Sequence, residues 1–187
     1  MEAISSAAQG APTLTRLQLA IVAIGYAAVL LASAALVLMR HLQYVIHAND
    51  VDASSGMWAF GDLLLELFIA ALFLIPTLLL AFFIRNSETA YTKYSQILLG
   101  IAFGTPVCLS TFFIPAIAQS EWGVGWAVGW FCEGWVSAAP VFLVGLVCSR
   151  LLARFKRAKR LILYGLLIEI GTYALLLAAV VLPWHRT

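Results

Sequence analysis

Residues 57–84 read MWAFGDLLLELFIAALFLIPTLLLAFFI, an apolar run whose charged side chains are Asp62 and Glu66. A helix needs about 20 apolar residues to cross a hydrocarbon core of roughly 30 Å, so this run predicts a membrane-spanning helix. The whole chain of 187 residues agrees, since 63% of it is hydrophobic and 11% is charged, against about 25% charged in soluble domains. We therefore expect an integral membrane protein. The net charge of +2 excludes a strongly basic nucleic-acid binder.

Four further apolar runs of spanning length surround this one, at residues 17–39, 97–118, 127–148 and 161–182. Backbone amides cannot stay unpaired in lipid, and the alternating pattern of barrel strands is absent, so these runs must be helices. The sequence predicts an all-α integral membrane protein, a five-transmembrane-helix bundle that forms a single domain over residues 1–187. An alternative for the first run is a cleavable secretory signal, because Arg16 precedes it and residues 32–34 are small. The run continues past them to Met39, which favours a span.

Lys and Arg are distributed unequally between the two sets of connections. Nine of the 11 fall on one side of the predicted bundle, and Arg40 and Arg186 fall on the other. Cytoplasmic loops keep an excess of basic residues, so we expect the N-terminus inside and the C-terminus outside. Compact loops, and the lack of a transit peptide or an N-x-Ser/Thr site, favour the bacterial inner (plasma) membrane.

Acidic residues lie inside the predicted spans with no basic residue at their depth: Asp62, Glu66, Glu133 and Glu169. An ionised carboxylate at the centre of a spanning helix costs roughly 2.5 to 3.5 kcal/mol on insertion scales, so such residues are functional candidates. Asp62 and Glu66 are four apart and share one helix face. A rise of about 1.5 Å per residue brings Glu133 to a similar depth. Such groups must be protonated, hydrated, bound to a cation or paired with one another.

Together these residues predict an outward-facing acidic intramembrane pocket that binds a ligand or an ion. Its walls would be Asp62, Glu66 and Glu133, its floor would be Glu169, and His41, His47 and Arg40 would surround its mouth. The alternative is structural: each protonated acid hydrogen-bonds a neighbouring helix, and Asp62 pairs with Arg40.

A basic cluster precedes the last predicted span: Arg154, Lys156, Arg157, Lys159 and Arg160. Each such residue gains roughly 1 kcal/mol near anionic lipid heads, so these side chains are predicted to bind lipid headgroups. Membrane topogenesis alone explains the same charges.

The sequence predicts no metal site and identifies no cofactor. His41 and His47 are six apart and do not share a helix face, which disfavours a metal site with Asp50 and Asp52.

The cysteines Cys108, Cys132 and Cys148 fall, by residue count within their spans, at middle, outer and inner depths. No two of them are therefore expected within disulfide reach.

Three classes of function remain open. The first is binding or transport of protons, a cation or a cationic small molecule in the acidic pocket, with a homo-oligomer expected because the bundle is small. The second is a non-catalytic accessory or scaffold subunit of a larger membrane complex, which small-residue helix faces favour. The third is an intramembrane enzyme that modifies a lipid or a quinone, but no nucleophile or metal set is recognisable, so the sequence leans away from an enzyme. The expected partners are membrane lipids and either further copies of the chain or a membrane complex, with no nucleic acid.

Overall fold

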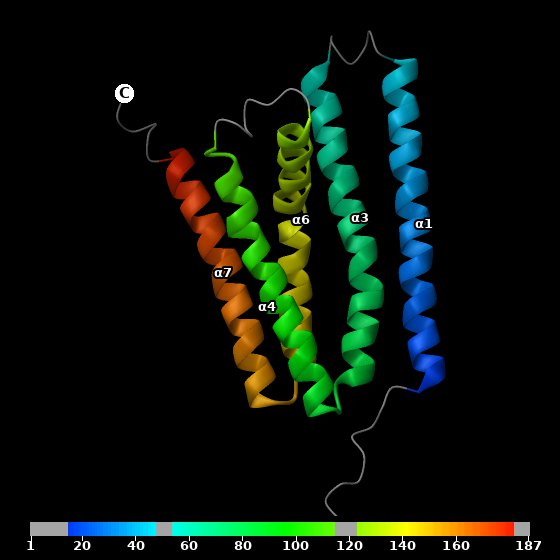
Figure 1. The fold of residues 1–187 in the computed structure, drawn as a ribbon, viewed down its shortest axis with the longest axis vertical. Helices are drawn as coiled ribbons and strands as arrows, with labels where there is room; N and C mark the ends of the chain where they lie inside the picture. Colours follow the sequence, from blue (N-terminus) through cyan, green and yellow to red (C-terminus); the bar gives the residue numbers. More distant parts are fainter. Residues whose placement is uncertain (1–14, 48–53, 115–122, 182–187) are drawn as a thin grey trace, which may run out of the picture.

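The computed structural model describes residues 15–47, 54–114 and 123–181, and in these ranges the chain is all-helical. Five long helices follow one another: α1 (Arg16–Ile46), α3 (Ser55–Ile84), α4 (Glu88–Thr111), α6 (Val124–Leu152) and α7 (Lys156–Val181). Figure 1 shows that successive helices run in opposite directions along one long axis. The prediction of an all-α architecture is confirmed.

Four of the helices are long and apolar enough to cross a membrane: Arg16–Ile46, Ser55–Ile84, Ala127–Leu152 and Lys156–Ala178. Their outward surfaces are apolar as well. On α1, for example, Leu17 and Leu31 are 71% and 74% exposed. Apolar surface of this extent is typical of contact with lipid. The protein therefore has the character of an integral membrane protein.

Helix α6 lies at the centre of the packing, since it contacts α3, α4 and α7. Helix α4 packs most extensively against α7, and α1 packs chiefly against α3. By contrast, α3 and α4 touch little. Figure 1 shows these two helices close together where α3 ends and α4 begins, and farther apart toward their other ends.

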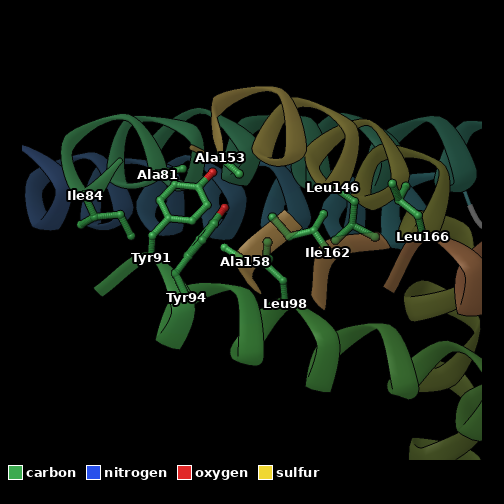
Figure 2. Close-up of a cluster of buried hydrophobic side chains, with 10 residues drawn as sticks. All are labelled: Ala81, Ile84, Tyr91, Tyr94, Leu98, Leu146, Ala153, Ala158, Ile162 and Leu166. Carbon is green, nitrogen blue, oxygen red and sulfur yellow. The ribbon is translucent and has the colours of Figure 1, made fainter. Parts of the chain in front are cut away.

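The converging end is closed by a cluster of buried side chains (Figure 2). Two tyrosines of α4 in this cluster form hydrogen bonds with the last turns of α6. The Tyr91 hydroxyl donates to the Ser149 carbonyl oxygen at 2.5 Å, and the Tyr94 hydroxyl lies 2.9 Å from the Ser149 hydroxyl. The apolar members come from α3, α4, α6 and α7 and from the α6–α7 connection: Ala81, Ile84, Leu98, Leu146, Ala153, Ala158, Ile162 and Leu166. This end of the bundle is therefore tightly packed.

Helix α4 differs from the span expected at residues 97–118. It begins nine residues earlier, at Glu88, and ends at Thr111. Ser87 caps it, since its side chain accepts a hydrogen bond from the backbone N–H of Ala90, and Glu88 provides an acid in the first turn. Both features are favourable at a helix N-terminus. Residues 115–118 of the expected span lie outside the described residues.

Helices α1 and α7 are longer than the apolar runs predicted. Helix α1 continues past Met39 through Ile46. Helix α7 begins at Lys156, five residues before the apolar run at 161. Lys156, Arg157, Lys159 and Arg160 of the basic cluster are therefore part of α7, whereas Arg154 lies in the short connection, residues 153–155, between α6 and α7.

Candidate functional site

A groove of about 690 Å³ lies between α3 and α4, with α6 as its floor. It arises because α3 and α4 separate toward one end while both still pack on α6. Its lining on α3 runs from Glu66 to Thr77, which spans about 16 Å at 1.5 Å per residue. Apolar side chains dominate its surface: Phe73, Leu74, Leu98, Ile101, Phe131 and Phe142.

Among the described residues that line this groove, Glu66 is the one with a carboxylic acid side chain. It is half-buried. Ser137, on the facing helix α6, lies close to its carboxyl group. Gly134 of α6 faces the acid, since a Cβ atom at that position would lie 3.7 Å from Glu66 Oε1, in ordinary van der Waals contact. The groove thus offers one acidic group beside a long apolar surface.

Asp62 and Glu133 lie within electrostatic reach of Glu66, but neither lines the groove. Glu133 is exposed on α6. The residue count predicts a common depth for these three acids, and Asp62 and Glu133 each interact electrostatically with Glu66.

Asp62 of α3 forms an ion pair and hydrogen bonds with side chains of α1. Arg40 Nε donates to Asp62 Oδ1 at 2.5 Å, and the Tyr44 hydroxyl donates to Asp62 Oδ2. Arg40 Nη2 also donates to the Trp58 carbonyl oxygen at 2.8 Å, and its guanidinium lies 4.4 Å from the Trp58 ring centroid. Gly61 permits this approach, because a Cβ atom there would meet Arg40 Nη2 at 3.1 Å. Arg40 therefore pairs with Asp62 and joins α1 to α3, as in the structural alternative.

Glu169 lies apart from the other acids, fully buried on α7. Its Oε1 accepts a 2.7 Å hydrogen bond from the Thr105 hydroxyl of α4, while its Oε2 has no partner among the described residues. Trp135 of α6 donates to the same Thr105 hydroxyl at 3.3 Å. Thr105 and Trp135 line the groove, and Glu169 does not. Glu169 is thus behind the groove wall rather than at its floor.

The two histidines are not brought to the groove. His41 is exposed on α1, and His47 is the residue that caps the end of that helix. Neither lines the groove. The mouth predicted from Arg40, His41 and His47 is therefore not assembled around Glu66.

Sequence reasoning missed the polar neighbours of the acids: Tyr44, Trp58, Thr105, Trp135 and Ser137. A signal for the first two was present. Arg40 and Tyr44 are four apart, as are Trp58 and Asp62, so each pair presents one face to an antiparallel neighbour. No local pattern marks Thr105 or Ser137, because their partners come from other helices.

The basic cluster divides into two groups. Arg154 donates to the Asn86 side chain at 2.9 Å, and Lys159 is exposed. Lys156, Arg157 and Arg160 line a depression at the start of α7.

Cys108 and Cys132 lie closer together than their predicted depths imply, and all three cysteines are free. Cys108 on α4 and Cys132 on α6 are both buried, and their thiols lie within electrostatic reach of one another. The residue count failed because α4 ends at Thr111, which places Cys108 near the end of its helix rather than at mid-span.

No group of three or more His, Cys, Asp or Glu side chains that could hold a metal ion occurs in the described parts of the chain. Asp50 and Asp52 lie outside those parts.

Comparisons with family profiles, with curated proteins and with solved structures found no match to this chain.

Proposed function

We propose that this protein is a membrane-embedded binding protein for a cationic amphipathic small molecule, which it holds in the groove between α3, α4 and α6. The observation that carries the proposal is the position of Glu66 on a predominantly apolar lining. The apolar part of the ligand lies along Phe73, Leu98 and Phe142, and its cationic group lies at Glu66. Binding pockets commonly combine an apolar lining with few polar groups that orient the ligand.

The apolar lining favours an organic cation over a bare ion or a proton path. A metal cation such as Ca²⁺ takes six to eight oxygen ligands in place of its water, and the groove offers few oxygen atoms beside Glu66 and the hydroxyls of Thr77 and Thr105. A lipophilic cation brings its own apolar surface and needs one counter-charge. The sequence predicts binding or transport, and we propose transport of such a molecule as an extension of its binding.

The test is equilibrium binding of radiolabelled tetraphenylphosphonium, a lipophilic cation, to the purified protein in detergent. Glu66→Gln removes the counter-charge with little change of shape, so we expect at least a tenfold weaker Kd, about 1.4 kcal/mol. Glu169→Gln is the matched control, because it makes the same change in the membrane interior outside the groove. Its Kd is expected to stay within twofold of the parent protein.

Neutral triphenylphosphine supplies a second control, since it keeps the apolar surface and lacks the charge. Its binding should be equal in the parent protein and in Glu66→Gln. Equal loss of tetraphenylphosphonium binding in the Glu66 and Glu169 variants contradicts the proposal, as does an unchanged Kd in both.

An accessory or scaffold subunit is the second candidate function, and α1 supports it. This helix packs chiefly against α3, and only 6% of its most apolar window is buried. Its small residues Ala28, Ala32 and Ala35 are exposed. Small residues permit close helix contacts in membranes. Absence of any saturable tetraphenylphosphonium binding by the parent protein would favour this candidate.

We further propose that all five helices cross the bacterial inner membrane, with the N-terminus inside and the C-terminus outside. Support comes from the alternating directions of the helices, which bring Arg16, Arg85 and the basic start of α7 to one end of the bundle (Figure 1). An excess of basic residues marks the cytoplasmic side.

A further inference from the structure

The start of α7 carries a feature that the groove does not use: a depression of about 740 Å³ lined by both charged and apolar side chains. Lys156, Arg157 and Arg160 supply three cations within the first five residues of the helix, and Glu88, from the start of α4, supplies one acid. Phe155, Leu161 and Tyr164 complete the lining. The charged part and the apolar part thus adjoin one another in a single hollow.

None of the three cations forms an ion pair with a described residue. Within residues 15–47, 54–114 and 123–181, the one ion pair joins Arg40 to Asp62. Lys156, Arg157 and Arg160 take part in no ion pair there. Their charge adds to the positive end of the α7 dipole, which also favours an anion. A phosphate group bound here would accept hydrogen bonds from the two Arg side chains. The helix dipole would also stabilise its negative charge.

The apolar side of the depression points to the kind of anion. Leu161 and Tyr164 follow Arg160 along α7, inside the segment Lys156–Ala178 that is apolar enough to cross a membrane. Tyr164 is 52% exposed. A molecule that places its phosphate among the cations and its hydrocarbon along Leu161 and Tyr164 contacts both the charged and the apolar part of the lining, whereas a free phosphate ion contacts only the charged part. Glu88 reduces the net positive charge, which fits a phosphodiester with one negative charge better than a polyphosphate.

We propose that this depression binds one anionic phospholipid, with its phosphate held by Lys156, Arg157 and Arg160 and its acyl chain leaving past Leu161 and Tyr164. The site is separate from the groove between α3, α4 and α6, and it does not depend on the function proposed for that groove.

The test is native mass spectrometry of the delipidated protein titrated with dioleoylphosphatidylglycerol or with dioleoylphosphatidylcholine. We expect phosphatidylglycerol to bind at least tenfold more tightly. The double variant Arg157→Gln/Arg160→Gln should weaken that binding about 30-fold, which corresponds to the attraction expected for two basic residues near an anionic headgroup. The double variant Arg16→Gln/Lys93→Gln is the matched control, because it removes the same charge from exposed residues outside the depression. Its affinity should change less than threefold.

A gain of affinity separates the proposal from simple loss of folding. Glu88→Gln makes the depression more positive, so it should tighten phosphatidylglycerol binding about threefold or more. The proposal is overturned if both double variants lose affinity equally, if phosphatidylcholine binds as tightly as phosphatidylglycerol, or if Glu88→Gln weakens binding. Displacement of the lipid by 10 mM inorganic phosphate would likewise overturn it in favour of a phosphate-only site.

Discussion

At the scale of single residues, the ion pair between Arg40 and Asp62 is one of the contacts that join α1 to α3. Arg40 meets Asp62 and the Trp58 carbonyl oxygen, and Tyr44 donates to the other Asp62 oxygen. The two charged side chains are 19% and 35% exposed, so solvent screens them only in part. We expect Asp62→Asn to lower the free energy of unfolding by about 1 to 2 kcal/mol, because it leaves the Arg40 guanidinium without its counter-charge. Chemical unfolding of the purified protein in detergent measures this change.

A double-mutant cycle with Arg40→Gln tests whether the loss comes from the pair. The coupling free energy between the two substitutions should be at least about 0.5 kcal/mol. Glu133→Gln is the control, since Glu133 is an exposed acid on α6 and its loss should change stability by less than about 0.5 kcal/mol. Additive effects of the Arg40 and Asp62 substitutions would show that the ion pair does not stabilise the contact.

At the scale of elements, the position of α4 along the chain differs most from the prediction. The apolar run predicts a helix over residues 97–118, and α4 covers Glu88–Thr111. Helix α4 faces both α6 and α7, and the residues that it buries include hydroxyl-bearing ones: Tyr91, Tyr94, Ser95 and Thr105. A helix packed on two neighbours tolerates polar groups that find partners there. These polar residues lower the mean hydropathy of the first turns of α4. The apolar run therefore begins at residue 97, nine residues after the helix does.

The cysteines give a direct measurement of the register of α4 against α6. A neutral bifunctional bimane reagent should cross-link Cys108 to Cys132 in the folded protein, because their thiols are neighbours across α4 and α6. The cross-link appears as a bimane adduct that joins two peptides in mass spectrometry. Cys108→Ser and Cys132→Ser should each abolish it, and Cys148→Ser should not. If α4 occupied residues 97–118 as the apolar run indicates, Cys108 would lie at mid-depth and the cross-link would not form.

At the scale of the whole molecule, the alternating helices bring Arg16, Arg85 and the basic start of α7 to the packed end, whereas Arg40 lies toward the other end. Single cysteines in a background without native cysteines test the proposed orientation. Ser55→Cys, at the start of α3, should react with a membrane-impermeant maleimide in intact cells. Arg16→Cys, at the start of α1, should react only after the membrane is permeabilised. The opposite pattern would invert the topology, and equal labelling before permeabilisation would contradict a membrane-crossing α1.

The sequence by itself determined the class of protein, its helical architecture and the approximate position of each helix. These properties depend on hydropathy, backbone hydrogen bonding and charge at helix ends, which are read along one dimension. It also brought Asp62, Glu66 and Glu133 near one another, because a shared helix face and a shared depth are enough for that.

Only the tertiary structure decided what each acid contacts. The rotation and lateral position of a helix set its partners, and neither follows from counting residues along a span. Asp62 therefore meets Arg40 and Tyr44, Glu169 meets Thr105 behind a wall of the groove, and Glu66 alone of the acids lines the groove. The groove itself exists because α3 and α4 diverge while both remain packed on α6.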